Sequence, residues 1–132
     1  VFEWWTGDRY EGQWRRNSKH GAGVFTSHHG GRYEGQWKDG QRFGQGVETW
    51  PAKANPSGMR ETYEGPFRYN YPHGKGVLTF EDGTRDDGTF LRGQHDGLFH
   101  RTTASGEKVT MRWREGRDVT IRTGPLDKWL NG

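Results

Sequence analysis

The stretch Tyr10-Glu11-Gly12-Gln13-Trp14 decides the fold, because it returns as Tyr33-Glu34-Gly35-Gln36-Trp37 and again as Tyr63-Glu64-Gly65-Pro66-Phe67. Each copy is followed at a constant distance by a second glycine-rich cluster, of which His20-Gly21-Ala22-Gly23-Val24 is the first. The first two pentads start 23 residues apart, and the second and third start 30 apart. Repetition at such a period is the signature of an array of small structural units.

The repeats form a single array that extends over the chain. We expect a partial unit at residues 1–9, units at residues 10–32, 33–62, 63–85 and 86–108, a degenerate cap at residues 109–123 and a tail at residues 124–132. The unit at residues 86–108 is a worn copy, since Asp86 replaces the tyrosine and Phe99 replaces the second glycine. Because the chain starts inside a unit and has no initiator methionine, we expect the N-terminus to be a fragment boundary or a disordered cut.

An insertion at residues 51–62 interrupts the second unit. Residues 51–58 contain two prolines and a glycine, residues that favour turns. The register is kept on both sides of the insertion, so we expect the extra residues to form a loop at one long edge of the structure. Loops of this kind often carry specificity.

The pentad has the alternation of a half-buried strand. Positions one, three and five are aromatic, glycine and aromatic, and they point to one face, while the intervening polar residues point to the other. The segments after the second cluster, such as Val77-Leu78-Thr79-Phe80, have high β propensity. We expect a five- or six-residue polar loop between the two strands, as at residues 16–20, and a short turn between units.

Each repeat is therefore one hairpin, and the predicted fold is all-β. It is an elongated, single-layer antiparallel meander of stacked β-hairpin repeats with about ten strands. A glycine facing the aromatic row leaves a hollow in which rings lie flat, so Gly35→Val should cost about 1–3 kcal/mol as overpacking.

The tail is predicted to form a short C-terminal helical cap. Leu126, Trp129 and Leu130 have the spacing of one helix face, and Pro125 stands at a favourable first position. Such a turn would fold over the last hairpin and shield the sheet edge. The alternative is a peptide that binds a partner.

Composition favours a thin structure over a thick core. Only 28% of the residues are hydrophobic, while 14% are aromatic and 22 are glycine, so aromatic rings carry the burial. The absence of cysteine excludes disulfides and cysteine zinc sites. No apolar run approaches the roughly 18 residues of a membrane span, and a net charge of +3 permits anionic partners without demanding one.

No motif indicates catalysis. We expect His20, His73 and His95 to lie in corresponding hairpin loops and the adjacent His28 and His29 to point to opposite faces. The repeated glutamates recur along a ribbon instead of converging on one point. We expect Glu34 and its equivalents to pair with strand neighbours such as Arg32. The predictions are therefore no enzyme activity, no catalytic residues, no cofactor, no metal and no small-molecule substrate. Basic residues alternate with acids in the first half, which also argues against nucleic acid.

The unit of pentad, polar loop, Gly-x-Gly-Val and glycine turn resembles the MORN repeat, the membrane occupation and recognition nexus motif. The match extends from Gly7 to about Arg117 and is strongest in the first two units. The resemblance implies an extended hairpin array that scaffolds, dimerises or binds partner helices and peptides, with phosphoinositide binding proposed for several members. It implies that the following residues line a partner-binding groove: Tyr10, Trp14, Tyr33, Trp37, Tyr63 and Phe67.

The predicted function is a non-catalytic protein-interaction scaffold that binds a partner peptide or helix, or a second copy of itself, within a larger assembly. Core packing is the alternative role for the aromatic row. The alternative function is a peripheral membrane module that binds phosphoinositide or other anionic headgroups through Arg15, Arg16, Lys19 and Lys38. Both readings place the protein in the cytoplasm or on the cytoskeleton, or at the periphery of a membrane.

Overall fold

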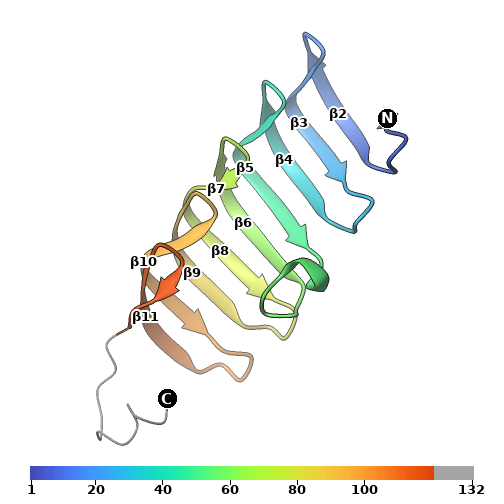
Figure 1. Cartoon of the computed structure of the whole chain (residues 1–132). Helices are drawn as coiled ribbons and strands as arrows, with labels where there is room; N and C mark the ends of the chain where they lie inside the picture. Colours follow the sequence, from blue (N-terminus) through green and yellow to red (C-terminus); the bar gives the residue numbers. More distant parts are fainter. Residues whose placement is uncertain (121–132) are drawn as a thin grey trace, which may run out of the picture.

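The computed structural model describes residues 1–120 as one antiparallel sheet of 12 strands (Figure 1). The strands are β1 (Phe2–Glu3), β2 (Arg9–Arg15), β3 (Ser18–Thr26), β4 (Arg32–Lys38), β5 (Gln41–Trp50), β6 (Glu61–Arg68), β7 (Tyr71–Pro72), β8 (Gly74–Phe80), β9 (Arg85–Leu91), β10 (Gln94–Thr102), β11 (Lys108–Arg114) and β12 (Arg117–Asp118). Each pairs with the next in chain order, except that β7 and β8 both pair with β6. The predicted single-layer antiparallel meander is confirmed.

The strands within a unit are joined by two-residue turns, so the predicted five- or six-residue loop is wrong. Strand β3 already begins at Ser18, and Arg16 and Asn17 alone form the turn. Both have positive φ, 51° and 66°, as a type I′ turn requires. The equivalent turns at Asp39-Gly40 and Arg92-Gly93 have the same signs.

A bulge follows each of these turns and accounts for the first glycine of the second cluster. Between β2 and β3 the pairing passes from Gly12↔Gly23 to Trp14↔Lys19, which leaves extra residues on β3. The bulge contains Gly21 at φ +74°, a conformation that side chains other than glycine rarely adopt. The same register shift occurs between β4 and β5 and between β9 and β10.

The turns form two rows along the long edges of the sheet. Figure 1 shows the two-residue turns along one edge and the connections between units along the other. Most connections between units have the hydrogen bonds seen at residues 27–31, where the Ser27 amide donates to Gly31 and the Gly30 amide donates to Ser27.

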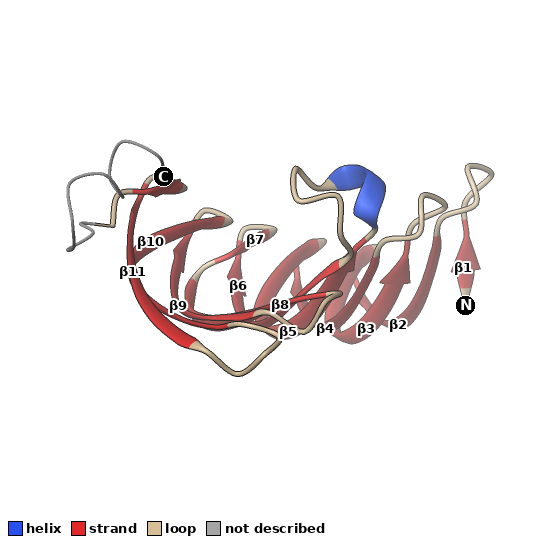
Figure 2. Ribbon diagram, turned by 90° about the horizontal axis from the view of Figure 1, so that it is seen from below, coloured by secondary structure: helices blue, strands red, loops and turns tan. Residues whose placement is uncertain are grey.

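The insertion lies among the connections between units, at a long edge as predicted. It comprises residues 51–60, because Glu61 and Thr62 belong to β6, and it includes the 3₁₀ turn η1 (Ala52–Ala54). The Asn55 amide donates to the carbonyls of Trp50, Pro51 and Met59, which closes the loop on itself. Figure 2 shows that this loop rises on one side of the curved sheet.

The pairing register settles which residues share the aromatic face. Gly23 lies opposite Gly12 and Gly35, and Phe25 lies opposite Tyr10 and Tyr33. Gly23, not Val24, therefore shares the face of the pentad aromatics. The predicted helical cap at the tail falls outside the described residues, and the helical turn within them is η1 in the insertion, where no helix was predicted. The last described strand, β12, comprises Arg117–Asp118 and closes a hairpin with β11.

Candidate functional site

The pentad tyrosines cover glycines on the neighbouring strand. A Cβ atom on Gly46 would lie 2.5 Å from Tyr33 Cε2, and one on Gly76 would lie 2.5 Å from Tyr63 Cε2. The Tyr33 hydroxyl donates to the Gln36 carbonyl at 2.7 Å, and Tyr10 and Tyr63 make the equivalent bond to the carbonyl three residues on. Burial raises the pKa of Tyr33 to about 12. The glycines are thus the floor on which these rings lie.

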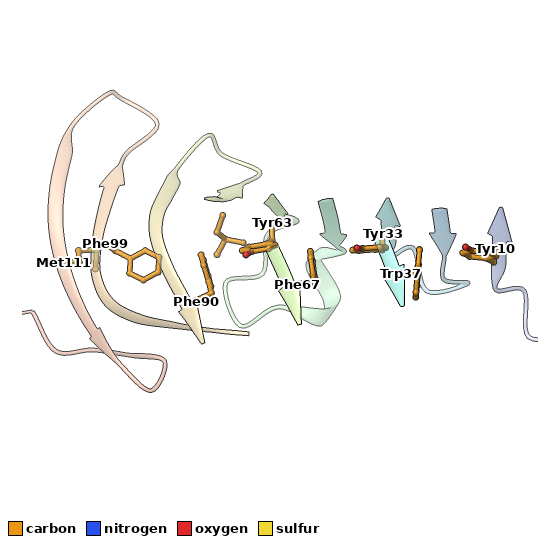
Figure 3. Packing of buried hydrophobic residues seen from close by; sticks show 9 residues of the cluster. Tyr10, Tyr33, Trp37, Tyr63, Phe67, Phe90, Phe99 and Met111 are labelled. Atoms are coloured by element: carbon orange, nitrogen blue, oxygen red, sulfur yellow. The ribbon is translucent and has the colours of Figure 1, made fainter. Parts of the chain in front are cut away.

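The aromatics at pentad position five pair with glycines of the preceding unit across the sheet. Trp37 pairs with Gly21, and Phe67 pairs with Gly44. Neighbouring rings meet edge to face: Tyr33 lies 5.0 Å from Trp37 and 4.9 Å from Phe67, with interplanar angles of 80° and 87°. Figure 3 shows these rings following one another across the strands, so the single-layer sheet buries its own core.

The predicted groove residues are mostly this core. Tyr10, Tyr33, Trp37, Tyr63 and Phe67 are 0–7% exposed, and Trp14 is 45% exposed. The structure brings all six together in one row, as predicted, but their rings face each other, and five of them offer almost no surface to a partner. Their role in partner binding stays a prediction.

Cations are seated between the rings. Lys19 pairs with Trp14 in the sheet, and its Nζ lies 5.1–5.6 Å from the centroids of Trp4, Tyr10, Phe25 and Trp37. Burial lowers the pKa of Lys19. The equivalent Arg42 lies over Tyr33 and Phe67 and forms an ion pair with the buried Glu48. Sequence reasoning missed this pattern, although a residue of this kind stands ten positions into both units.

The four cations proposed for lipid headgroups therefore differ in their surroundings. Arg15, Arg16 and Lys38 are exposed at the two-residue turns. Lys19 points into the aromatic core instead, so the structure does not place it beside the other three.

The fourth unit exchanges the aromatic and the small position across the hairpin. In earlier units a tyrosine on the first strand covers a glycine on the second. Here Phe99, on the second strand, covers Gly88 on the first, and a Cβ on Gly88 would lie 2.7 Å from the Phe99 ring. Phe99 is fully buried and meets Phe90 edge to face at 5.2 Å. The sequence of this unit departs from the repeat, but its packing is kept with the partners reversed.

Asp86 occupies the space where a tyrosine would stand. It is fully buried and accepts two hydrogen bonds from Arg101, at 2.7 and 2.8 Å, and lies 3.0 Å from His95 Nε2. Burial by itself would raise the pKa of Asp86, but the hydrogen bonds from Arg101 and His95 outweigh it and hold the pKa below its usual value. Both carboxylate oxygens of Asp86 therefore have polar partners within the protein, and the charge has a structural role.

A groove on the aromatic face lies beside this carboxylate. It encloses about 410 Å³ between the insertion on one long edge and the two-residue turns on the other. Half-buried aromatic rings form much of its wall, and residues from both long edges of the sheet contribute to its lining. The lining includes Trp50, Pro56, Leu78, Phe80, Phe90, Gly93, Arg101 and Trp113. The Trp113 indole Nε1 is buried there, and residues 1–120 provide no hydrogen-bond partner for it. Part of the aromatic face is thus open to a ligand where the repeats depart from regularity.

The histidines and carboxylates form no metal-binding arrangement in the part of the chain that the structure describes. No group of three or more possible metal ligands occurs among residues 1–120. The prediction that His20 and His95 are loop residues is wrong, since both lie in strands, because the turns are short. Arg32 does pair with Glu34, at 3.1 Å, as predicted.

The geometry defines an array of β-hairpins stacked edge to edge on a row of rings and glycines. The MORN repeat family matches residues 10–32, 33–53 and 63–85, which is half of the chain, and the protein belongs to this family. MORN repeats are modules that interact with proteins and membranes, and the repeat itself is not an enzyme. The comparison with curated proteins gives no match. Within residues 1–120, no helix has the length and apolar character needed to cross a membrane.

Proposed function

We propose that the chain is a non-catalytic scaffold whose aromatic face binds a segment of a partner protein at the groove between the insertion and the fourth unit. The observation that carries this proposal is the 410 Å³ groove, walled by Trp50, Phe80 and Trp113 and open to solvent. Aromatic side chains held in a rigid sheet are good anchors for a partner, because little conformational entropy is lost on binding.

The chemistry of the groove favours a partner with an apolar side chain flanked by polar groups. Leu78 and Phe90 form an apolar floor, while Glu61 and Arg101 stand at its margins. A helix or extended peptide can place one large apolar residue in such a space. A second copy of the chain is the other partner that the repeat array can accept. A scaffold of this kind would act in the cytoplasm or on the cytoskeleton.

The experiment is site-specific photocrosslinking in the source cell. A photoreactive phenylalanine analogue replaces Phe80 in the groove, and a matched protein carries it at Leu98, which is 51% exposed on the other face. We expect a defined crosslinked partner, or a crosslinked dimer, from position 80 and not from position 98. Equal crosslinking from both faces would count against a groove.

Titration of the purified partner with variants of the chain then tests individual residues of the groove. Substituting Phe80 and Trp113 by Ala should weaken binding at least about tenfold, since truncated aromatic anchors cost 2 kcal/mol or more. The control substitutes Trp5, which is 96% exposed, and Leu98. The buried Trp37 and Tyr63 are unsuitable, because their removal would unfold the array.

Headgroup binding is the competing hypothesis. Arg15, Arg16 and Lys38 are exposed, while Lys19 is taken up by the aromatic rings. Flotation with phosphatidylserine vesicles at two salt concentrations tests it, because exposed charges are screened over roughly 10 Å at 0.1 M salt.

A further inference from the structure

The two long edges of the sheet differ in charge, and one of them is basic. We call the two-residue turns with their flanking residues the hairpin edge, which comprises residues 15–18, 38–41, 68–71, 91–94 and 114–117. It contains seven basic and two acidic residues, whereas the connections between units, counted with their flanking residues in the same way, contain six basic and six acidic residues. The net charge of +3 hides this asymmetry.

The basic side chains of the hairpin edge are available for binding. All seven are exposed: Arg15, Arg16, Lys38, Arg68, Arg92, Arg114 and Arg117. Within residues 1–120, the structure shows no ion pair for the first five of these. Successive turns lie about 10 Å apart, because two strand spacings separate them.

The edge is rigid. The Gly40 amide donates to the Lys19 carbonyl at 2.9 Å, and the Gly93 amide donates to the Pro72 carbonyl at 2.9 Å, so each turn is bonded to the preceding unit. At the turn that contains Asn70, the Asn70 side chain accepts a hydrogen bond from the Arg42 backbone amide of the preceding unit at 2.9 Å. The cations are therefore held in a fixed row.

Exposed apolar groups interrupt the row. Tyr69, Tyr71 and Leu91 are 59%, 56% and 45% exposed. Lys38 lies over Phe43 at 5.0 Å, and Phe43 meets Tyr69 edge to face at 6.2 Å. Arginine and tyrosine together are typical of the central residues of protein interfaces.

We propose that the hairpin edge binds an acidic segment of a partner protein, which runs along the row with a carboxylate at each turn and its apolar side chains on Tyr69, Tyr71 and Leu91. In a polyproline II conformation every third side chain points the same way and lies about 9 Å further along the chain, which is close to the spacing of the turns. The twist of the sheet turns the edge steadily along its length. A flexible chain follows such a line, whereas a flat membrane meets only a short part of it. This surface is separate from the proposed groove.

The test uses a fluorescein-labelled synthetic peptide of four Glu-Val-Thr triplets, and a neutral peptide with Gln in place of Glu, in fluorescence polarisation titrations. The acidic peptide should bind, the neutral one should not, and the affinity should fall as salt rises. The double variant R68E and R92E should lose about tenfold in affinity, from two reversed contacts of exposed charges.

The matched control is the double variant K53E and R60E. It changes the net charge equally, but both residues are exposed on the insertion at the opposite edge. Its affinity should stay within about twofold of the unaltered chain. Replacing Tyr69 and Tyr71 by Ala should weaken binding about threefold without changing the salt dependence. Thermal unfolding should be unchanged in all three variants.

Three results would overturn the proposal: equal binding of the acidic and neutral peptides, equal loss in the two charge-reversed variants, or no loss in either. A fourth is a membrane result, in which R68E and R92E abolish flotation with phosphatidylserine vesicles while peptide binding is unaltered. That outcome would assign the edge to lipid.

Discussion

Replacement of Gly46 by Ala tests whether the glycines are floors for the tyrosine rings. The new Cβ would lie 2.5 Å from Tyr33 Cε2 and 2.6 Å from Cζ, well inside contact distance. Tyr33 is 1% exposed, its hydroxyl is bonded to the Gln36 carbonyl, and Trp37 and Phe67 pack on either side of it. Because the ring has no free direction in which to move, the clash becomes overpacking strain of about 1–3 kcal/mol.

Gly31→Ala is the matched control. A Cβ there would meet only ordinary contacts, at 3.7 Å from the Thr49 carbonyl oxygen and 3.8 Å from Ser27. Its backbone lies outside the left-handed region, so the substitution should stabilise the chain by up to about 1 kcal/mol through the unfolded state. The lower entropy of the unfolded chain also offsets part of the strain in Gly46→Ala, so we expect this variant to lose about 1–2 kcal/mol of stability.

Urea unfolding followed by tryptophan fluorescence measures both variants. We expect the free energies of unfolding of the two variants to differ by about 2 kcal/mol, which is larger than the uncertainty of the extrapolation. If they differ by less than about 0.5 kcal/mol, the rings are free to move off the glycines and the argument is wrong. Gly35→Val should cost at least as much, because its Cβ would lie 2.5 Å from the Gly46 Cα.

The remaining predictions concern the fourth unit, pH and the insertion. Asp86→Ala should cost about 3 kcal/mol of stability, because Arg101 loses a fully buried partner, whereas Asp87→Ala, which removes an exposed pair with Arg85, should cost less than about 1 kcal/mol. Since the folded pKa of Tyr33, about 12, lies above its ordinary value, stability should be complete below about pH 10 and fall as pH rises through 12; a flat urea midpoint between pH 9 and 12 would contradict this. Replacing residues 51–60 by the five residues 27–31 should leave the melting temperature nearly unaltered and change partner affinity, while a large drop in melting temperature would show that the loop is structural.

Sequence patterns predicted the strands and their buried face but not what covers that face. Alternation places Tyr33 and Trp37 on one side of β4, and the structure confirms this. Whether such a row is open or covered depends on ring tilts and on contacts between units. Phe67, 34 positions after Tyr33, closes over it from the next unit, and no local pattern contains that contact.

The two-residue turns were missed because the turn signal is weak in the first unit. Arg16 takes a positive φ, and arginine is not a residue that favours it. Asp39-Gly40 has the composition of a type I′ turn, so comparison of all units at that position could have found the turn. The exchange in the fourth unit was also visible in principle, since the ring lost at Asp86 reappears at Phe99 on the paired strand.

Stability and recognition are assigned to different positions of the repeat. Rings and glycines that recur in register bury each other, so they hold the array together and leave little surface for anything else. The surfaces that we propose for binding lie outside this row: the insertion, the groove beside the fourth unit and the exposed side chains on the hairpin edge. A substitution at a recurring position should therefore change stability first and binding only as a consequence. A substitution on the proposed binding surfaces outside this row should change binding with the fold intact.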